Sequence, residues 1–402
     1  MINNTIYKNT SVGLIPIDWE VKKLGEIAKV KHGRDQKKVI CDSGIYPILG
    51  TGGEIGRTNS FLYDKPSVLI GRKGTIDKPR FMDTPFWTVD TLFYTELSQD
   101  IVPIWLFNVF QTINWYYYNE SSGVPSLSGS NISAIPLPIP PLLEQQKIAS
   151  ILSTWDNAID ITKKVLSNLE VIKKAMTINV LSGKIRFKTF LKNNKISQRN
   201  GYSIPDDWEV KNLSSVLEQV KKPVKPEKDT LYKQLGIRSH TKGIFYKDSV
   251  TGQSLGNKSV FAIEPDCFIL NIVFAWEHAI AKTTIAEQDM IVSHRFPMYK
   301  PLAPKLDLDY LLFFFKSKKG KDLLGLASPG GAGRNKTLGQ KEFLKLKIPI
   351  PPIKEQKAIA LFLETYDSEI KLHQQKLQAL QLQKKGLMQQ LLTGKVRVKT
   401  NN

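Results

Sequence analysis

The chain has 402 residues, and at roughly 150 residues per domain this length predicts two or three domains, each able to bury its own core. Hydrophobic residues make up 41% and charged residues 23% of the chain, a balance that excludes wholesale disorder. Lysine and arginine number 57 against 37 acidic residues, and the resulting net charge of +20 indicates an acidic partner, either nucleic acid or an anionic membrane surface.

The start of the chain and its cysteines bear on the compartment. Residues 1–6 lack the charged start and the apolar run of a signal peptide. The most apolar stretch, 101–118, contains a proline and several amide side chains, so it predicts a buried amphipathic helix rather than a membrane span. Cys41 and Cys267 cannot build a disulfide framework, and neither has the neighbours of a zinc site. We therefore expect a soluble protein of the reducing cytoplasm, with no membrane partner.

Short strands and loops are predicted for the first domain, residues 1–140. Tyr46–Gly50 and Ser67–Gly71 are β-prone runs that end in glycine, and a helix is expected at Trp105–Phe110. A long helix follows within residues 141–190. Its apolar side chains keep a spacing of three to four residues from Glu144 onward, a Pro-Pro pair precedes it, and Gly183 stands where a C-terminal glycine cap belongs.

The second half of the chain repeats the first. Ile-Pro-x-Asp-Trp-Glu-Val-Lys occurs at 15–22 and 204–211, Pro-Ile-Pro-Pro-x-x-Glu-Gln at 138–145 and 349–356, and Leu-[Ser/Thr]-Gly-Lys-x-Arg at 181–186 and 392–397. We expect a second domain at 191–350, with strands at 267–271 and 272–276 and a helix at 310–315, and a second long helix within 351–402. The predicted fold is α+β: two similar domains separated by two long helices that form an antiparallel coiled coil, with an internal pseudo-two-fold repeat.

The sequence offers no catalytic centre. Pro205-Asp206 with Glu209-Val210-Lys211 resembles the string of metal-dependent nucleases, but two residues between the acids cannot bring both carboxylates to one metal. The glycine-rich run 50–56 lacks the third glycine of a dinucleotide fingerprint and is predicted to be a turn. No Walker-type ATP motif and no Asn-Pro-Pro-aromatic or Asp-Pro-Pro-aromatic motif of amino-methyltransferases occurs, and the histidines lack metal-ligand spacing. We therefore expect no enzyme activity, no cofactor and no metal in this chain itself.

Basic and amide side chains gather in the glycine-rich loops of both domains. Arginine can bind the edge of guanine with two hydrogen bonds, asparagine and glutamine can do the same with adenine, and lysine mostly neutralises phosphate. A solvated surface with ordinary turns would explain any one of them equally well, but the clusters together favour contact with DNA. The predicted DNA-binding residues are Arg72, Lys73, Lys78, Arg80, Ser130 and Asn131 in the first domain, and Arg238, His240, Lys242, His294, Arg295, Arg334, Asn335 and Lys336 in the second.

These repeated motifs, with Tyr-Pro-Ile-Leu-Gly at 46–50 and Ile-Gly-Arg-Lys-Gly at 70–74, make the chain closely similar to the specificity (S) subunit of bacterial type I restriction–modification systems over residues 11–399. The resemblance implies that each domain is a target recognition domain that reads one half of a bipartite, asymmetric site in double-stranded DNA. It implies that the helices set the spacing and dock two methyltransferase subunits. S-adenosylmethionine would be bound by those subunits, and ATP- and Mg²⁺-dependent translocation and cleavage would be performed by restriction subunits.

Two other classes of protein remain open on the residues alone. One is a stand-alone DNA-cleaving enzyme whose catalytic residues are dispersed along the chain. The other is a coiled-coil scaffold whose positive charge serves RNA or a membrane. Steeply salt-dependent binding to duplex DNA would separate the scaffold from a DNA-binding protein, because phosphate contacts release counterions.

Overall fold

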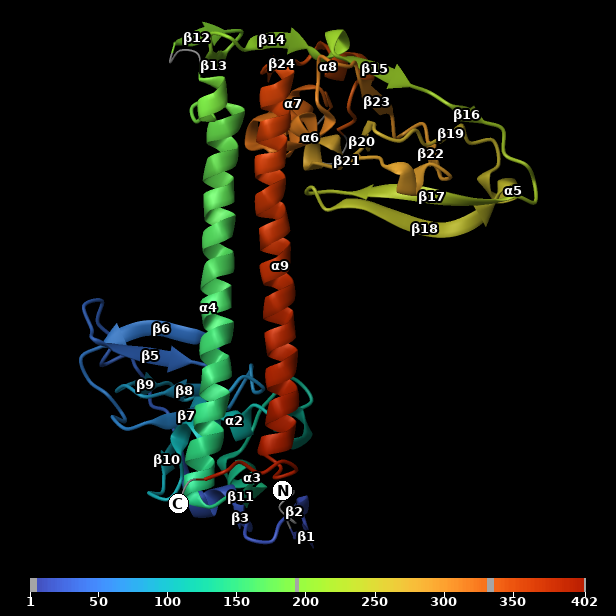
Figure 1. Cartoon of the computed structure of the whole chain (residues 1–402). Coiled ribbons are helices and arrows are strands. Elements are labelled where there is room, and N and C mark those ends of the chain that lie inside the picture. The colour runs from blue at the N-terminus through green and yellow to red at the C-terminus, as the bar shows by residue number, and fades with distance from the viewer. Residues whose placement is uncertain (1–5, 192–194, 331–335, 401–402) are drawn as a thin grey trace. The chain divides into compact units, whose positions relative to one another are not determined.

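The computed structural model describes residues 6–191, 195–330 and 336–400, which divide into two compact units (Figure 1). Unit 1 comprises residues 1–164 and 374–402, and unit 2 comprises residues 165–373. Two long helices, α4 (Leu142–Leu181) and α9 (Ile353–Leu391), run through both units. Each unit therefore holds one α+β domain, part of α4 and part of α9. No described helix is both long and apolar enough to cross a membrane.

The domain of unit 1 is built on a four-stranded antiparallel sheet in the order β4-β10-β7-β8. Its central strand β7 (Ser67–Gly71) is buried along its whole length, as its run of Val, Leu and Ile predicts. A smaller sheet, β6-β5-β9, contains β5 at Tyr46–Gly50. Of the glycine-rich run 50–56 that was predicted to be a turn, only Thr51 and Gly52 form the hairpin turn, because residues 53–56 belong to strand β6. The remaining strands are β1 (Tyr7–Thr10), β2 (Gly13–Pro16), β3 (Glu20–Lys23), β4 (Ala28–His32), β6 (Gly53–Thr58), β8 (Arg80–Met82), β9 (Trp87–Thr88), β10 (Leu92–Leu97) and β11 (Pro136–Ile139).

Helix α2 (Pro103–Phe110) covers this sheet and confirms the helix predicted late in the first domain. Proline at its first position suits a helix start, where the backbone N–H has no partner to lose. The described short helices are α1 (Leu24–Ile27), the 3₁₀ turn η1 (Trp115–Tyr118) and α3 (Gly129–Ser133). Buried side chains of α2, including Trp105, join one core with Trp19 and with Leu152 of α4.

The domain of unit 2 repeats the four-stranded sheet as β15-β23-β20-β21 and adds a five-stranded sheet, β16-β19-β22-β17-β18. The hairpin of β17 (Leu231–Arg238) and β18 (Gly243–Thr251) is longer than the β5–β6 hairpin of unit 1 and accounts for part of the extra length of the second domain. The other strands are β12 (Ile196–Arg199), β13 (Tyr202–Pro205), β14 (Glu209–Asn212), β15 (Leu217–Val220), β16 (Pro223–Val224), β19 (Val260–Ala262), β20 (Phe268–Leu270), β21 (Ile280–Lys282), β22 (Ile291–Ser293), β23 (Met298–Pro301) and β24 (Lys347–Ile350). The helices include α5 (Gly252–Leu255), α6 (Leu308–Lys316), α7 (Lys318–Leu326) and α8 (Gln340–Lys345), and short 3₁₀ turns occur at Lys188–Phe190, Leu213–Ser215, Ala275–Glu277 and Ile285–Glu287.

One predicted strand of this domain is wrong. Residues 272–276 form a turn that leads into the 3₁₀ helix η4 (Ala275–Glu277), although their composition is β-prone. The side chain of Asn271 accepts a hydrogen bond from the N–H of Val273, and the N–H of Phe274 donates to the carbonyl of Asn271. Asparagine side chains stabilise such turns by bonding to the backbone two residues on, and here this outweighs the strand preference of the residues that follow.

Within each unit the two long helices pack antiparallel, as predicted. In unit 1 the Nζ of Lys384 on α9 lies 2.6 Å from Oδ1 of Asp156 on α4. In unit 2 Lys173 on α4 forms the same contact with Asp367 on α9. The two acids are 211 residues apart, and so are the two lysines, so the internal repeat extends to the ion pairs between the helices.

The repeated motifs meet in one polar cluster in each unit, which we call a clasp. In the clasp of unit 1, Arg397 donates two hydrogen bonds to Glu144 and two to Asp18, and the indole N–H of Trp19 donates to Glu144 at 2.8 Å. The head motif, the first turn of α4 and the segment after α9 are therefore tied together. Three motifs far apart in the sequence serve one structural purpose.

The clasp of unit 2 has the same geometry. Arg186, which follows α4, donates two bonds to Glu355 and two to Asp207, and Trp208 donates to Glu355 at 3.0 Å. The hydrogen bonds to Glu355 raise the pKa of Arg186, so this guanidinium stays charged under all physiological conditions. Its side chain is only 5% exposed.

The glycines that end the long helices are also explained by the clasps. Gly183 and Gly394 adopt φ of +70° and +71°, the left-handed conformation of a helix C-terminal cap. A Cβ at Gly183 would lie 2.4 Å from Cδ of Pro205, and one at Gly394 would lie 2.4 Å from Cδ of Pro16. Both the backbone conformation and the close approach therefore require glycine at these two positions.

Candidate nucleic-acid interface

In unit 1 the structure brings Arg72 and Lys73 beside the segment that leads to Ser130 and Asn131. Arg72 and Lys73 follow β7, and the N–H of Leu127 donates to the carbonyl of Arg72 at 2.8 Å. On the other side, the N–H of Arg72 donates to the carbonyl of Thr91 at 2.8 Å. The loop after the central strand is thus held from both sides, while Lys73 remains exposed.

Arg80 joins the same edge of the domain through the β5–β6 turn. Its Nη2 donates to the carbonyl of Thr51 at 3.3 Å. A Cβ at Gly53 would lie 3.5 Å from Nη1 of Arg80, and one at Gly74 would lie 3.7 Å from the hydroxyl of Thr51. Arg80, the glycine-rich turn and the loop after β7 therefore lie close together.

The other predicted residues of unit 1 have different surroundings. Lys78 lines a groove with Phe107 of α2 and Asp156 of α4. Asn131 lies on α3, where its amide donates to Glu120, which also accepts from Ser128 at 2.6 Å. Glu120 was not foreseen from the sequence, because nothing in the local pattern shows that an acid eleven residues earlier would pair with this asparagine.

In unit 2 the loop after β20, residues 271–278, occupies the place of the loop after β7. The N–H of Leu338 donates to the carbonyl of Ile272 at 2.8 Å, and the N–H of Ile272 donates to the carbonyl of Arg295 at 3.0 Å. These two bonds match those made by Arg72 in unit 1. The backbone frame is shared, but an apolar Ile272 stands where unit 1 has an arginine, and the basic residue is now Arg295 on the adjoining segment.

The predicted residues around this loop come together from three segments. His294 and Arg295 are exposed in the connection between β22 and β23. The ammonium of Lys336 lies 5.6 Å from the ring centre of Trp276, an arrangement in which the aromatic face attracts the cation. Trp276 is not among the predicted DNA-binding residues, because the β-prone residues around it predict a strand at this position. Arg334 and Asn335 lie outside the described residues.

The tip of the β17–β18 hairpin docks on the end of the same loop. His240 and Thr241 both have positive φ, as the tight turn of a two-residue hairpin requires. The N–H of His240 donates to the carbonyl of Glu277 at 2.7 Å, and that of Thr241 to the carbonyl of His278 at 3.0 Å. His240, Lys242 and Arg238 remain exposed, with the Arg238 guanidinium 5.2 Å from the ring centre of Phe245.

The buried imidazole of His278 makes the stability of unit 2 depend on pH. Burial lowers the pKa of His278 from 6.5 to about 4, and the neighbouring Lys321 and His240 contribute in the same direction. The unfolded chain therefore takes up the proton first as the pH falls. The stability that the neutral, buried imidazole of His278 contributes is fully present above pH 6.5 and is lost as the pH falls from 6.5 to 4. We expect unit 2 to lose about 3 kcal/mol of unfolding free energy over that interval, at 1.36 kcal/mol per pKa unit.

Urea unfolding of unit 2 at pH 7 and pH 4 measures this loss. His278→Asn is the matched variant, since asparagine tolerates the φ of +64° at this position and does not titrate. The variant should lose less stability than the wild-type protein between the two pH values. An equal loss in both proteins would show that other groups cause the pH dependence.

Exposed cations and amides on loops can contact phosphates and the edges of bases without any chemical reaction. In residues 6–191, 195–330 and 336–400, no group of three or more His, Cys, Asp or Glu side chains is placed to hold a metal ion.

Comparison with known proteins places the chain in one family. The family model described as the type I restriction modification DNA specificity domain matches residues 16–171 and 205–382. The MjaVIII specificity subunit of a type I restriction enzyme from Methanocaldococcus jannaschii is 25% identical over 417 residues, which cover 96% of this chain and 95% of the relative. A second protein of that organism, provisionally named the MjaX specificity subunit, is 26% identical over 98% of this chain and 97% of its own length.

The fold agrees with a solved structure of the same kind. The crystal structure of the S subunit of a type I restriction–modification system from M. genitalium superimposes with a TM-score of 0.60 at 13% identity, covering 97% of this chain and 96% of that one. The two family matches coincide with the two repeated halves of the chain, and each match includes the loop after the central strand. The chain therefore belongs to the type I restriction–modification DNA specificity family, as a specificity subunit with two recognition domains.

Proposed function

We propose that each unit reads one half of a bipartite, asymmetric site in double-stranded DNA. The observation that carries this proposal is the shared backbone frame around the loop after the central strand, which presents different side chains in the two units. A common frame with Arg72 in one unit and Ile272 beside Arg295 in the other suits two different base sequences. The net charge of +20 supplies the attraction to phosphate.

The long helices dock two methyltransferase subunits and set the unread spacer between the half-sites. Support comes from exposed apolar side chains that recur at the repeat spacing of 211 residues. Unit 1 exposes Ile161 and Leu382, and unit 2 exposes the equivalent Leu372 and Val171. Exposed apolar residues on otherwise polar helices are typical of partner surfaces, and their duplication suits two copies of one partner.

Catalysis belongs to the partners in this proposal. The chain acts without a cofactor of its own, S-adenosylmethionine is bound by the methyltransferase subunits, and ATP and Mg²⁺ act with restriction subunits. The absence from the sequence of the methyltransferase and Walker motifs supports this division. Such a complex would work in the cytoplasm, where the DNA is.

Exchange of one recognition domain tests the proposal. Residues 16–137 are replaced by the corresponding segment of another specificity subunit, the chain is assembled with its methyltransferase subunits, and the methylated motif is determined by sequencing of modified DNA. We expect one half-site to change and the other to stay the same, because the contacts of each loop lie within its own unit. A simultaneous change of both half-sites would contradict two independent readers.

A further inference from the structure

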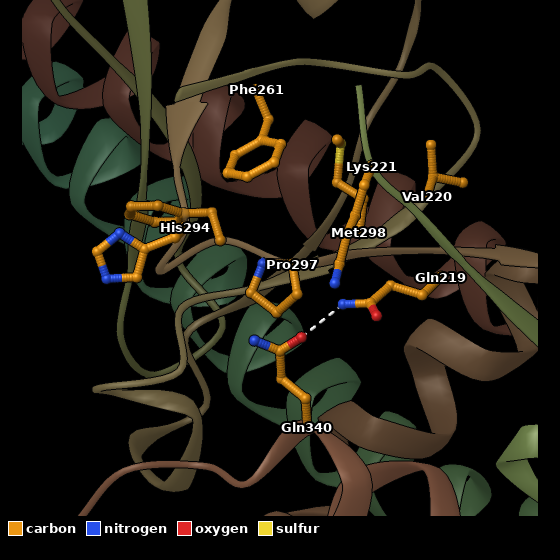
Figure 2. A pocket seen from close by; sticks show the side chains of 9 residues that line it. Gln219, Val220, Lys221, Phe261, His294, Pro297, Met298 and Gln340 are labelled. Atoms are coloured by element: carbon orange, nitrogen blue, oxygen red, sulfur yellow. Dashed lines mark hydrogen bonds between the residues drawn. The ribbon is translucent and has the colours of Figure 1, made fainter. Parts of the chain in front are cut away.

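A pocket of about 130 Å³ opens in unit 2 between the sheet and the start of α8 (Figure 2). Phe261, Phe296 and Met298 supply apolar parts of its wall. Gln219, on β15, and Gln340, at the first position of α8, contribute side-chain amides. The pocket therefore combines a hydrophobic wall with paired amide groups, a combination suited to a flat heteroaromatic edge that carries both hydrogen-bonding groups and a methyl group.

The two amides hold each other in place. Gln219 donates a hydrogen bond from Nε2 to Oε1 of Gln340, as the dashed line in Figure 2 shows. Neither amide has another hydrogen bond among the described residues. One mutual bond leaves the pair with an amino group that can donate and a carbonyl group that can accept.

The pocket lies within the candidate interface of unit 2. His294 lines it, and Gln340 comes two residues after Leu338, whose N–H bonds to the loop after β20. Lys221, a further lining residue, is exposed. The amide pair is therefore next to the basic side chains predicted to approach DNA.

Unit 1 has no such pair. The motif spacings of 189 and 211 residues place Val30 and Gly129 at the positions of Gln219 and Gln340. The spatial relation is preserved, since a Cβ at Gly129 would lie 3.9 Å from Cγ1 of Val30. The amide pair is consequently specific to unit 2 and is not part of the backbone arrangement that the two units share.

We propose that Gln340 and Gln219, which hold each other in position, together read an adenine base in the half-site recognised by unit 2. In the major groove adenine presents the acceptor N7 and the donor N6, which match the free donor and acceptor of the amide pair. The apolar wall suits the methyl group of the paired thymine. The proposal rests on the proposed function, since it takes unit 2 as the reader of one half-site.

The test uses the chain assembled with its methyltransferase subunits and duplexes that carry its methylated motif. Each adenine of the half-site read by unit 2 is replaced in turn by 7-deazaadenine, which lacks the N7 acceptor. For the wild-type complex we expect one replacement to weaken binding about 5- to 150-fold. Gln340→Ala should weaken binding to the unmodified duplex within the same range and should be insensitive to that replacement.

Two variants complete the design. Gln253→Ala removes an exposed amide on α5 and should retain both the affinity and the sensitivity of the wild-type complex. Gln340→Glu keeps the side-chain length and should lower the preference for adenine at the same position, because a carboxylate cannot donate to N7. If Gln340→Ala does not assemble, the 7-deazaadenine scan of the wild-type complex with Gln340→Glu still decides the question.

Three results would overturn the adenine assignment. The first is that Gln340→Ala loses the same affinity on every DNA sequence, which would mark a phosphate contact. The second is that Gln340 couples to a base in the other half-site, and the third is that no adenine couples to Gln340. None of these results contradicts the proposed function. The proposed function is contradicted by two other results: a wild-type complex with no bipartite methylated motif, or an exchange of residues 16–137 that alters both half-sites.

Discussion

Replacing Glu355 with alanine is expected to lower the unfolding free energy of unit 2 by about 3–5 kcal/mol, the cost of removing one partner of a buried ion pair. The Glu355 side chain is 1% exposed, and it accepts hydrogen bonds from Arg186 and from the indole of Trp208. Without Glu355, the buried guanidinium of Arg186 would lose one of its two carboxylate partners and keep Asp207. The indole N–H of Trp208 would lose its acceptor. Urea unfolding monitored on unit 2 by hydrogen exchange measures the change.

Two matched variants allow the loss of stability caused by Glu355→Ala to be compared with that of an exposed ion pair and with that of the other clasp. Glu209→Ala removes an exposed carboxylate that pairs with Lys211 in the same unit, and it should cost no more than about 0.5 kcal/mol. Glu144→Ala breaks the clasp of unit 1 and should cost less than Glu355→Ala, because the Arg397 side chain is 29% exposed and water can partly solvate it. If Glu355→Ala were no more harmful than Glu209→Ala, the clasp would not be a source of stability.

Inserting seven residues into α4 alone, after Lys164, is expected to reduce methylation at least tenfold. Seven residues add about 10.5 Å of helix, so Asp156 and Lys173 move apart along α4 while Lys384 and Asp367 keep their separation on α9. The two ion pairs between the helices, and the two clasps beyond them, can then no longer all form without distortion. The measurement is the methylation activity of the assembled complex.

A second insertion of seven residues in α9, after His373, should restore methylation activity, because both helices then lengthen equally. Seven residues make nearly two full turns, so the apolar side chains beyond the insertion stay on the same face of each helix. The restored complex should recognise the same half-sites with an unread spacer about three base pairs longer, at about 3.4 Å per base pair. An active double insertion with an unchanged spacer would show that the helices do not set the distance.

The repeats and the two long helices can be predicted from the amino-acid pattern alone. The spacing of apolar residues from Glu144, the Pro-Pro pairs and Gly183 and Gly394 placed both long helices within a few residues of their observed ends. Local signals suffice here, because helix periodicity, proline at a helix start and glycine at a helix end act within a few residues of chain. The buried strands β5 and β7 were predictable for the same reason.

The role of the repeated motifs and the grouping of the loop residues can be recognised only in the folded protein. The conjunction of Trp19, Glu144 and Arg397 spans nearly the whole sequence, and no local pattern reveals it. The turn after Asn271 replaced a predicted strand because one side-chain hydrogen bond outweighed the β-propensity of its neighbours. Gln219 and Gln340 carry no motif, and they form a pair only because the packing of α8 against the sheet brings residues 121 positions apart into contact.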